Sequence, residues 1–223
     1  MNLNKKVLIT GANGFVGRNL LKALEKEYSV TAQVRQRVDN TMNTCNFVVL
    51  DINGNTDWKP CLKGVETIIH LAAVAHNNSN DADYINEVNV EGTINLAYQA
   101  VESGVKRLVF ISSIGVNGNS TNDLPFSVNS KVKPHNKYAK SKYEAEVKLK
   151  RIEKEKGLET VIVRPTLVYG LDAPGNFGTL TRLVKKLPFL PFALVNNKRD
   201  FISVQNLVSL LIACINHPTA AGN

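Results

Sequence analysis

The hydrophobic positions of the chain form short apolar runs that alternate with longer segments of helical periodicity. Six runs predict β-strands, at residues 5–10, 29–35, 47–50, 67–71, 107–112 and 159–164. Four segments predict helices, at residues 15–26, about 83–103, 138–156 and about 204–216. Apolar strands separated by helices indicate a parallel sheet that is covered on both faces. We therefore expect an α/β fold, a doubly wound Rossmann sheet with the strand order 3-2-1-4-5-6.

Two segments interrupt this alternation. Residues 117–136 are rich in Asn, Ser and Pro, and residues 170–178 read GLDAPGNFG, so both are predicted to be loops. Each follows the carboxyl end of a strand, the edge at which open α/β sheets bind ligands. We expect residues 1–165 to form a dinucleotide-binding domain, and residues 166–223 to form a small substrate-binding lobe interleaved with the end of that domain.

A glycine-rich loop directly follows the first strand and opens the first helix. Its sequence is GANGFVG, residues 11–17. One glycine permits a positive φ, a second lets the backbone approach a pyrophosphate, and a third lets helix and strand pack closely. The N-terminus of the helix then presents free N–H groups to the phosphates. We expect a dinucleotide site that includes Gly11, Asn13, Gly14, Phe15, Val16 and Gly17.

The end of the second strand bears on which dinucleotide is bound. An acid there hydrogen-bonds the ribose hydroxyls of NAD, whereas an arginine accommodates the 2′-phosphate of NADP. The chain reads QVRQR at residues 33–37 and has no acid there. Arg35 therefore points to NADP, because a guanidinium binds phosphate bidentately. The alternative is that Arg35 and Arg37 are solvated surface residues. Asp51, at the end of the third strand, is placed to accept from the adenine amino group.

Tyr138 and Lys142 lie four residues apart in the sequence YAKSK, so a helix places them on one face. For acid–base work near neutral pH, the pKa of a tyrosine must fall roughly 3 units below its reference value near 10. We expect the Lys142 ammonium and a charged nicotinamide to supply that shift. Ser113 follows the fifth strand, where its hydroxyl can hydrogen-bond the reacting oxygen. We expect Ser113, Tyr138 and Lys142 to be catalytic.

Composition narrows the class of protein. The 223 residues are 43% hydrophobic and 21% charged, as in an ordinary globular domain. No apolar run suits a membrane span or a signal peptide, so we expect a cytoplasmic protein with no membrane partner. Three scattered cysteines without a CxxC motif indicate reduced thiols, with neither a metal site nor disulfides.

The net charge of +8 is compatible with a nucleic-acid partner or with a small polyanion, such as a dinucleotide together with a nucleotide diphosphate. The basic residues are dispersed, with some concentration between Lys131 and Lys156, where glutamates interleave with them at helical spacing. That pattern favours a solvated helix face, so we expect no nucleic-acid partner.

Taken together, the motifs resemble those of the extended short-chain dehydrogenases/reductases, specifically the NAD-dependent epimerase/dehydratase family of nucleotide-sugar enzymes. They occur in the family's order over nearly the whole chain: GANGFVG (11–17), HLAA (70–73), NVEGT (89–93), FISSIGVNG (110–118), YAKSK (138–142), RPTLVYG (164–170) and RDFISVQNL (199–207). The resemblance implies the catalytic residues named above, a nucleotide-sugar substrate, and a homodimer formed through the helices near 83–103 and 138–156.

The resemblance also implies further site residues. Near the cofactor we expect Asp51, Ile52, Leu71, Ala72, Ala73, Asn89 and Pro165. On the substrate side we expect Ser113, Asn176 and Arg199, of which Arg199 resembles the family's arginine that grips the substrate pyrophosphate. His70 and His76 look like neighbours of the cofactor-binding strand rather than catalysts.

The chain departs from the family's pattern at several positions. Ser113 is not followed by the Asp-Glu pair of sugar 4,6-dehydratases, so we expect no elimination chemistry. Asn117 stands where the family more often has tyrosine, and Ser203 and Asn206 replace the usual His and Asp. The chain ends where family members continue with more of the sugar-binding lobe, so we expect that lobe to be partial.

Three functions remain open from the sequence. The first is an NADP-linked reductase of a 4-keto nucleotide sugar, UDP-linked and used in bacterial polysaccharide synthesis, which Arg35 favours. The second is a nucleotide-sugar 4-epimerase that keeps NAD bound throughout. The third is a dinucleotide-sensing or RNA-binding module without turnover, which the intact Ser113, Tyr138 and Lys142 argue against.

Overall fold

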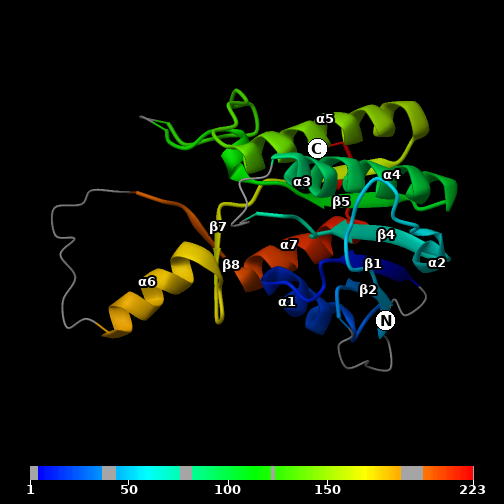
Figure 1. The fold of residues 1–223 in the computed structure, drawn as a ribbon, viewed down its shortest axis with the longest axis horizontal. Coiled ribbons are helices and arrows are strands. Elements are labelled where there is room, and N and C mark those ends of the chain that lie inside the picture. The colour runs from blue at the N-terminus through cyan, green and yellow to red at the C-terminus, as the bar shows by residue number, and fades with distance from the viewer. Residues whose placement is uncertain (1–4, 37–43, 76–81, 122–123, 187–197, 223) are drawn as a thin grey trace.

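The computed structural model describes residues 5–36, 44–75, 82–121, 124–186 and 198–222. A six-stranded parallel sheet with the order β3-β2-β1-β4-β5-β6 forms its centre, and this confirms the predicted Rossmann topology (Figure 1). The strands, in chain order, are β1 (Lys6–Thr10), β2 (Ser29–Val34), β3 (Thr44–Val48), β4 (Val65–His70), β5 (Arg107–Ile111) and β6 (Glu159–Val163).

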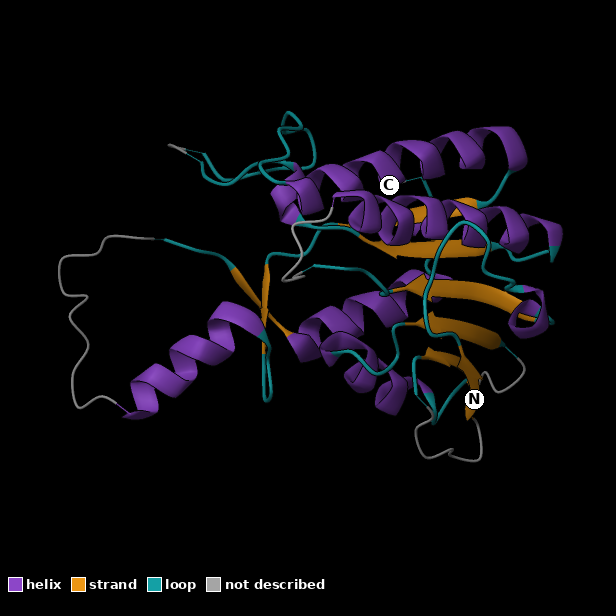
Figure 2. Cartoon of the chain, viewed as in Figure 1, coloured by secondary structure: helices purple, strands orange, loops and turns teal. Residues whose placement is uncertain are grey.

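Helices cover both faces of the sheet (Figure 2). Those between β1 and β6 are α1 (Phe15–Leu24), α2 (Lys59–Leu62), α3 (Ala82–Asn86), a π-helical turn (Glu87–Glu91), α4 (Gly92–Glu102), a 3₁₀ turn (Ile114–Val116) and α5 (Lys137–Lys156). After β6 come β7 (Leu167–Tyr169), α6 (Gly175–Lys186), β8 (Phe201–Ser203), α7 (Val204–Asn216) and a 3₁₀ turn (Pro218–Ala220). Strands β7 and β8 form a separate parallel pair that the apolar pattern did not predict.

The alternation of side chains along each strand divides the core into two layers. Leu8, Ile68 and Leu108 face α4 and α5, whereas the neighbouring Ile9 and Val109 face α1 and α7. All five side chains are fully buried. Because both faces are buried, the central strands are mainly apolar, as parallel strands between helices are expected to be.

Three predicted elements differ from the structure. The helix expected over residues 83–103 is divided by the π-helical turn, and β3 begins and ends a few residues earlier than expected. The predicted loop at 170–178 is wrong in its second half, because α6 begins at Gly175. Gly178 lies so close to Ala173 that a Cβ there would be 2.3 Å from the Ala173 carbonyl oxygen. The glycine allows close packing, and does not mark a turn.

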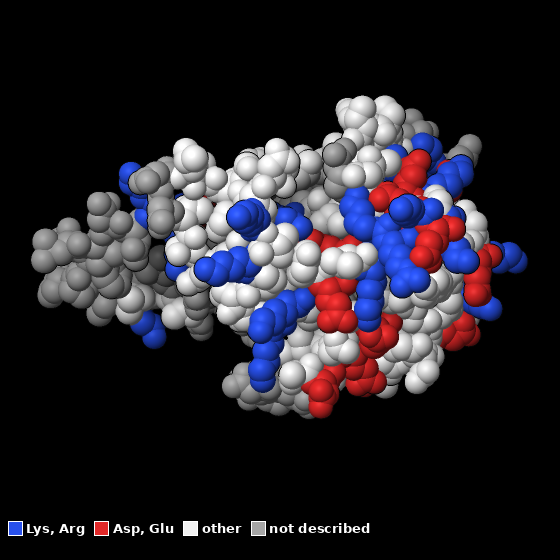
Figure 3. Space-filling view, turned by 90° about the horizontal axis from the view of Figure 1, so that it is seen from above, with Lys and Arg blue, Asp and Glu red and all other residues white. Residues whose placement is uncertain are grey.

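Charged side chains on α5 largely pair with one another, as their spacing predicts. Lys148, Lys150 and Arg151 each contact a glutamate three or four residues away. Seen from the side of α5, positive and negative side chains are interleaved over the surface (Figure 3). Within the described part of the chain, no helix has the length and hydrophobicity that crossing a membrane requires.

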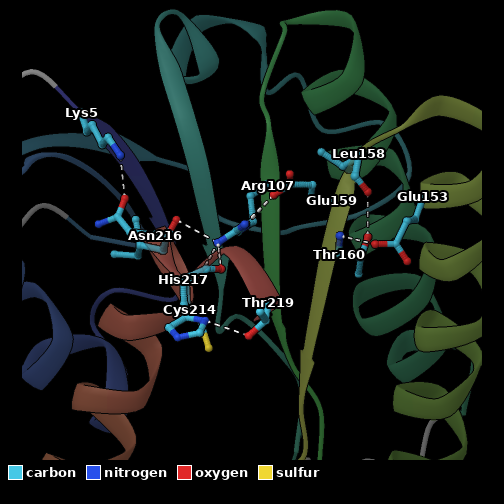
Figure 4. A network of polar contacts seen from close by, with 11 residues as sticks. Lys5, Arg107, Glu153, Leu158, Glu159, Thr160, Cys214, Asn216, His217 and Thr219 are labelled. Carbon is cyan, nitrogen blue, oxygen red and sulfur yellow. Dashed lines mark hydrogen bonds and ion pairs between the residues drawn. The ribbon is translucent and has the colours of Figure 1, made fainter. Parts of the chain in front are cut away.

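Arg107, the first residue of β5, joins the sheet to the end of α7 (Figure 4). Its Nε and Nη2 donate to the Glu159 carboxylate at 2.8 and 2.6 Å. Its Nη1 donates to the carbonyl oxygens of Cys214, Ile215 and His217 at 2.8, 3.2 and 3.1 Å. Cys214 and Ile215 lie in the last turn of α7, where carbonyls have no partner within the helix, so the guanidinium caps α7 from the strand. The His217 carbonyl, just after the helix, also accepts from the Ala220 N–H at 3.2 Å.

We expect Arg107→Met to lower the free energy of unfolding by about 2–4 kcal/mol, because it leaves the Glu159 carboxylate and the helix carbonyls without their donor. Glu159→Gln keeps an acceptor for the guanidinium at a half-exposed position, and should cost less than about 1 kcal/mol. Urea unfolding followed by circular dichroism measures both. Equal costs for the two variants would contradict the capping role of Arg107.

Candidate active site

The glycine loop connects β1 to α1 at the carboxyl edge of the sheet. Gly11 has φ +68°, and a Cβ there would lie 2.9 Å from the Ala72 nitrogen, just beyond β4. A Cβ on Gly17 would lie 2.3 Å from the Gly11 carbonyl oxygen. Both positions therefore require glycine, one for the turn and the adjoining strand, the other for packing of helix against loop.

The N-terminus of α1 has the properties of an anion site. Gly14 is the N-cap, no side chain caps the helix, and its first turn contains no acid. The backbone N–H groups at such an end carry a partial positive charge and favour a phosphate. Beside it lies a pocket of about 300 Å³ that the loop, the ends of β2, β3 and β4, and α3 line together.

The pocket brings together eight of the residues predicted to contact the cofactor: Gly11, Asn13, Gly14, Arg35, Ile52, Leu71, Ala72 and Ala73. Five further lining residues were not predicted: Gln33, Val34, Leu50, Tyr84 and Val88. Of the other predicted contacts, Phe15, Val16 and Gly17 belong to the first turn of α1. Asp51 is exposed, lies beyond the end of β3 and is not among the lining residues.

Gln33 supports the glycine loop from β2. Its Oε1 accepts from the Gly11 N–H at 2.8 Å, and its Nε2 donates to the Val49 carbonyl oxygen at 3.2 Å. The side chain is almost fully buried, so these contacts satisfy an amide that would otherwise be costly. A polar residue inside an otherwise buried strand was the sequence signal that could have identified it.

Arg35 follows β2 directly and is exposed at the pocket. No carboxylate lies among the lining residues of the pocket. Among the described residues, the end of β2 therefore presents Arg35 and no acid to a bound ribose.

A buried polar chain connects β1 to β4. The Ala72 N–H donates to Thr10 Oγ1 at 3.2 Å, and Thr10 Oγ1 lies 2.7 Å from His70 Nδ1. On the other side, His70 Nε2 lies 2.9 Å from Thr93 Oγ1, which donates to the Asn89 carbonyl oxygen at 2.8 Å. Since the Thr93 proton is used there, Nε2 must carry the imidazole proton and Nδ1 must accept from Thr10.

His70 is therefore neutral and structural, in keeping with its predicted place beside the cofactor strand. Burial, together with the charge of Lys142, lowers the pKa of His70 to about 3. His76, predicted with it, lies outside the described residues. Among the described residues there is no cluster of acidic, histidine or cysteine side chains suited to a metal ion.

Asn89 lies in the π-helical turn and is almost fully buried. Its Oδ1 accepts from the Val74 N–H at 2.8 Å, and its Nδ2 donates to the Val74 carbonyl at 3.1 Å and to Ser141 Oγ at 3.0 Å. Asn89 thus lies behind the pocket, where it joins the segment after β4 to α5. The π-helical turn, a feature frequent at functional sites, places the Asn89 amide between the segment after β4 and α5.

Ser113, Tyr138 and Lys142 come from two neighbouring elements. Ser113 is the N-cap of the 3₁₀ turn after β5, and its Oγ accepts from the Gly115 N–H at 3.1 Å. Tyr138 and Lys142 lie one turn apart near the start of α5. The main chain at Pro165, predicted near the cofactor, accepts from the Ile114 N–H at 3.0 Å and so holds the serine turn.

Lys142 is 1% exposed, and its ammonium nitrogen lies 4.2 Å from the centre of the Phe110 ring. Burial lowers the pKa of Lys142 to about 7, although the charge of Glu146 opposes the shift. Burial also raises the pKa of Tyr138 to about 12. Desolvation of the phenol thus dominates in the chain without a cofactor, and the lowering expected from Lys142 together with a charged nicotinamide stays a prediction.

Glu146, one helical turn after Lys142, is bound by an arginine. Arg164, just after β6, donates from Nε to Glu146 Oε1 at 2.9 Å and pairs with the second carboxylate oxygen as well. Its Nη1 donates to Asn117 Oδ1 at 3.2 Å. This pair links the end of β6, the turn after Ser113 and α5. Asn117, the unusual residue in the VNG motif, is the C-cap of this turn and joins it to Arg164.

Of the residues expected on the substrate side, Ser113 belongs to this centre, whereas Asn176 and Arg199 come from the part of the chain after β7. Arg199 is exposed, and one residue, Asp200, separates it from β8. Asn176 lies in the first turn of α6, and its side chain is outside what the structure describes. The structure thus assembles the cofactor side of the predicted site, while Arg199 and Asn176 stay predictions.

Comparison with known proteins identifies the family. Residues 7–223 match the model of the NAD dependent epimerase/dehydratase family. A UDP-glucose 4-epimerase from Vibrio cholerae is 44% identical over 97% of this chain and 68% of its own length. A putative UDP-glucose 4-epimerase from Methanocaldococcus jannaschii is 30% identical over 94% of this chain and 73% of its own length.

Solved structures show the same fold. The UDP-glucuronic acid 4-epimerase from Bacillus cereus, in complex with UDP-glucuronic acid and NAD, superposes with a TM-score of 0.82 at 21% identity, over 97% of this chain and 75% of that one. The motif order, the sheet topology and these matches agree, and the chain belongs to the NAD dependent epimerase/dehydratase family.

Proposed function

We propose that this chain is a 4-epimerase of a UDP-linked sugar that keeps NAD bound and uses Tyr138 as its acid and base. The names of the relatives from Vibrio cholerae and Methanocaldococcus jannaschii favour epimerase over the reductase that Arg35 first suggested. The pocket at the glycine loop suits a dinucleotide, with an uncapped helix N-terminus for its pyrophosphate.

The observation that carries this proposal is the burial of Lys142. An ammonium that is 1% exposed, with its pKa lowered to about 7, destabilises the fold at neutral pH. Ionisable groups with such perturbed pKa values concentrate at functional sites. Its position one helical turn from Tyr138, beside the end of β5, supports a catalytic centre over a dinucleotide-sensing module without turnover.

The proposed residues have distinct roles. When bound, NAD would take up a hydride from C4 of the sugar and return it to the opposite face of the same carbon. Tyr138 accepts the proton of the C4 hydroxyl during oxidation and gives it back during reduction. Ser113, whose Oγ already accepts from the Gly115 N–H, donates its own proton toward the reacting oxygen. Lys142 holds ribose hydroxyls through its ammonium.

The high pKa of Tyr138 in the chain alone has a consequence for this mechanism. Burial raises that pKa to about 12, so the phenol is protonated at neutral pH without further positive charge. We assign the lowering needed for catalysis to the positive charge of bound, oxidised NAD together with protonation of Lys142. Tyr138 should therefore become a base only once NAD is bound.

We expect the purified protein to interconvert UDP-glucose and UDP-galactose without added cofactor. Tyr138→Phe keeps the ring but removes the proton carrier, so kcat should fall about 10²-fold or more while NAD stays bound. Tyr143→Phe, on an exposed part of the same helix, is the matched control and should keep native kcat. A coupled assay for UDP-galactose measures turnover, and native turnover in Tyr138→Phe would contradict the proposal.

Arg35 keeps a reductase as the second candidate, since no acid is among the described residues that line the pocket and would oppose a 2′-phosphate. A charge-assisted contact to that phosphate is worth about ten- to hundredfold in affinity. Two results would favour the reductase. The purified protein would carry no NAD, and it would bind NADPH more tightly than NADH, a preference that Arg35→Ala removes. Tightly retained NAD supports the epimerase.

The buried lysine predicts a pH-dependent stability. The unfolded chain binds the Lys142 proton up to a pH near 10.5, but the folded chain only up to about 7. Between these values the unfolded state binds more protons, so the contribution of Lys142 to stability improves as pH rises. Lys142→Met removes the penalty, which amounts to roughly 3–5 kcal/mol.

We therefore expect Lys142→Met, free of cofactor, to be more stable than the native protein at pH 7, with the gap closing toward pH 10. Urea unfolding across this range tests it. Lys148→Met is the control, because Lys148 is a partly exposed surface lysine paired with Glu91 and Glu144. A gap that does not change with pH would show that the Lys142 ammonium is not desolvated.

We also propose that the chain forms a homodimer through α4 and α5. These helices lie side by side on the outer layer, where Tyr98, Tyr143 and Val147 are 45%, 36% and 51% exposed. Exposed apolar residues gathered on two adjacent helices suit a subunit interface.

Sedimentation velocity at micromolar concentration should give a dimer. Val147→Arg should weaken this dimer, whereas the control Val128→Arg, in an exposed loop, should leave it intact. A native monomer would contradict it.

A further inference from the structure

The two residues that precede α5 connect it to the turn that carries Ser113. Ser113 Oγ accepts from the Gly115 N–H at 3.1 Å, and the Gly115 carbonyl oxygen lies 3.2 Å from His135 Nδ1. His135 Nε2 lies 2.9 Å from Asn136 Nδ2. Asn136 Oδ1 in turn accepts from the Ala139 N–H at 2.7 Å, as the N-cap of α5. A continuous path of hydrogen bonds thus runs from the serine to the helix of Tyr138.

The partners in this path determine the protonation of His135. A carbonyl oxygen only accepts, so Nδ1 must donate and therefore carries a proton. The Asn136 oxygen is used by the helix cap, which leaves its NH₂ group facing Nε2, and an NH₂ group can only donate there. Nε2 must then keep its lone pair. The neutral Nδ1–H tautomer is the one form of the ring that satisfies both contacts.

The ring also packs directly on the turn. A Cβ added to Gly115 would lie 3.0 Å from His135 Cε1 and 3.2 Å from Ser113 Oγ, so the glycine admits both groups. A second link, from Asn117 through Arg164 to Glu146, attaches the far end of the turn to α5 two helical turns further along. The Ile114 N–H bond to the Pro165 carbonyl also holds the end at Ser113, so loss of the His135 contacts removes the connection of that end to α5 and leaves its connection to Pro165.

We propose that His135, together with Asn136, is a positioning residue that holds the Ser113 hydroxyl at a fixed distance from Tyr138, so that both reach the same oxygen of the substrate. The proposal rests on the proposed function of Ser113 and Tyr138. Proton transfer depends steeply on such distances, since displacement of a catalytic group by about 1 Å can cost on the order of 10²-fold in rate. His135 touches neither cofactor nor substrate in this assignment and acts through Gly115.

Steady-state kinetics on His135 and Asn136 variants tests this assignment. His135→Ala removes both contacts and should lower kcat about tenfold, with KM for the sugar nucleotide within about twofold, because substrate binding does not use these contacts. Asn136→Asp keeps the helix cap and places a carboxylate at Nε2, which favours the doubly protonated ring. That ring still donates from Nδ1 to Gly115, so this variant should keep most of the native kcat. His135→Gln offers an NH₂ group for Gly115 and an oxygen for Asn136, and should restore most of the native kcat.

His217→Ala is the matched control, because His217 is an exposed histidine near the end of α7 at the opposite edge of the sheet. It should keep native kcat. Native kcat in His135→Ala, or a His135→Gln variant as slow as His135→Ala, would overturn the proposal.

A spectroscopic measurement separates this proposal from the proposed function. In ¹⁵N-labelled protein without substrate, long-range ¹H–¹⁵N spectra should show His135 as the Nδ1–H tautomer, and Asn136→Asp should abolish that state. The Nε2–H tautomer in the native protein would show that His135 does not connect Gly115 to Asn136, and would overturn the proposal whatever the activity. If the native protein shows the Nδ1–H tautomer but has no turnover on any sugar nucleotide, His135 still connects the two residues, but the proposed function and the catalytic role of His135 both fail.

Discussion

The polar chain from Ala72 through Thr10, His70 and Thr93 to Asn89 joins the end of β1, where the glycine loop begins, to β4 and the π-helical turn. It crosses the point at which the strand order of the sheet reverses, where open α/β sheets bind their ligands. The direction of each hydrogen bond along this polar chain is determined, because each of its hydroxyls both donates and accepts. The Asn89 side chain extends it to Val74 and Ser141, so the wall of the pocket and the helix of the proposed catalytic residues share one buried framework.

The site combines groups that stabilise the fold with one that weakens it. His70 is buried, but it is neutral and fully hydrogen-bonded, so it costs little. Lys142 is equally buried, yet its ammonium faces the ring of Phe110 rather than a carboxylate. Glu146 is close enough to affect the Lys142 pKa, but Arg164 engages both of its oxygens. The arrangement keeps the lysine charge available at the expense of stability, a trade that active sites commonly show.

Much of the fold and part of the site were predictable from sequence, because they depend on local patterns. The parallel strands, α7 and the YAKSK helix follow from hydrophobic periodicity, and the phosphate loop follows from glycine spacing. Gln33 stands out in its strand as a polar residue, but its contact with Gly11 and the bridge through His135 were not predictable, because each depends on how segments distant in the sequence meet. Helix α6 was missed because its glycines resemble a turn, although Gly178 serves close packing. The raised pKa of Tyr138 was missed because burial, unlike the Tyr–Lys spacing, cannot be read from a motif.

The capping of α7 by Arg107 has a consequence for the order in which the protein can fold during synthesis. Arg107 and its partner Glu159 lie in β5 and β6, but the carbonyls to which the arginine donates lie at the end of α7 and at His217. Until that helix has left the ribosome, a nascent chain holds a nearly complete sheet whose α7-facing side, including Ile9 and Val109, is uncovered. The guanidinium meanwhile has only Glu159 as a partner. The apolar face of the Rossmann sheet is therefore covered by a segment that is translated after all six of its strands, and it is exposed to aggregation until then.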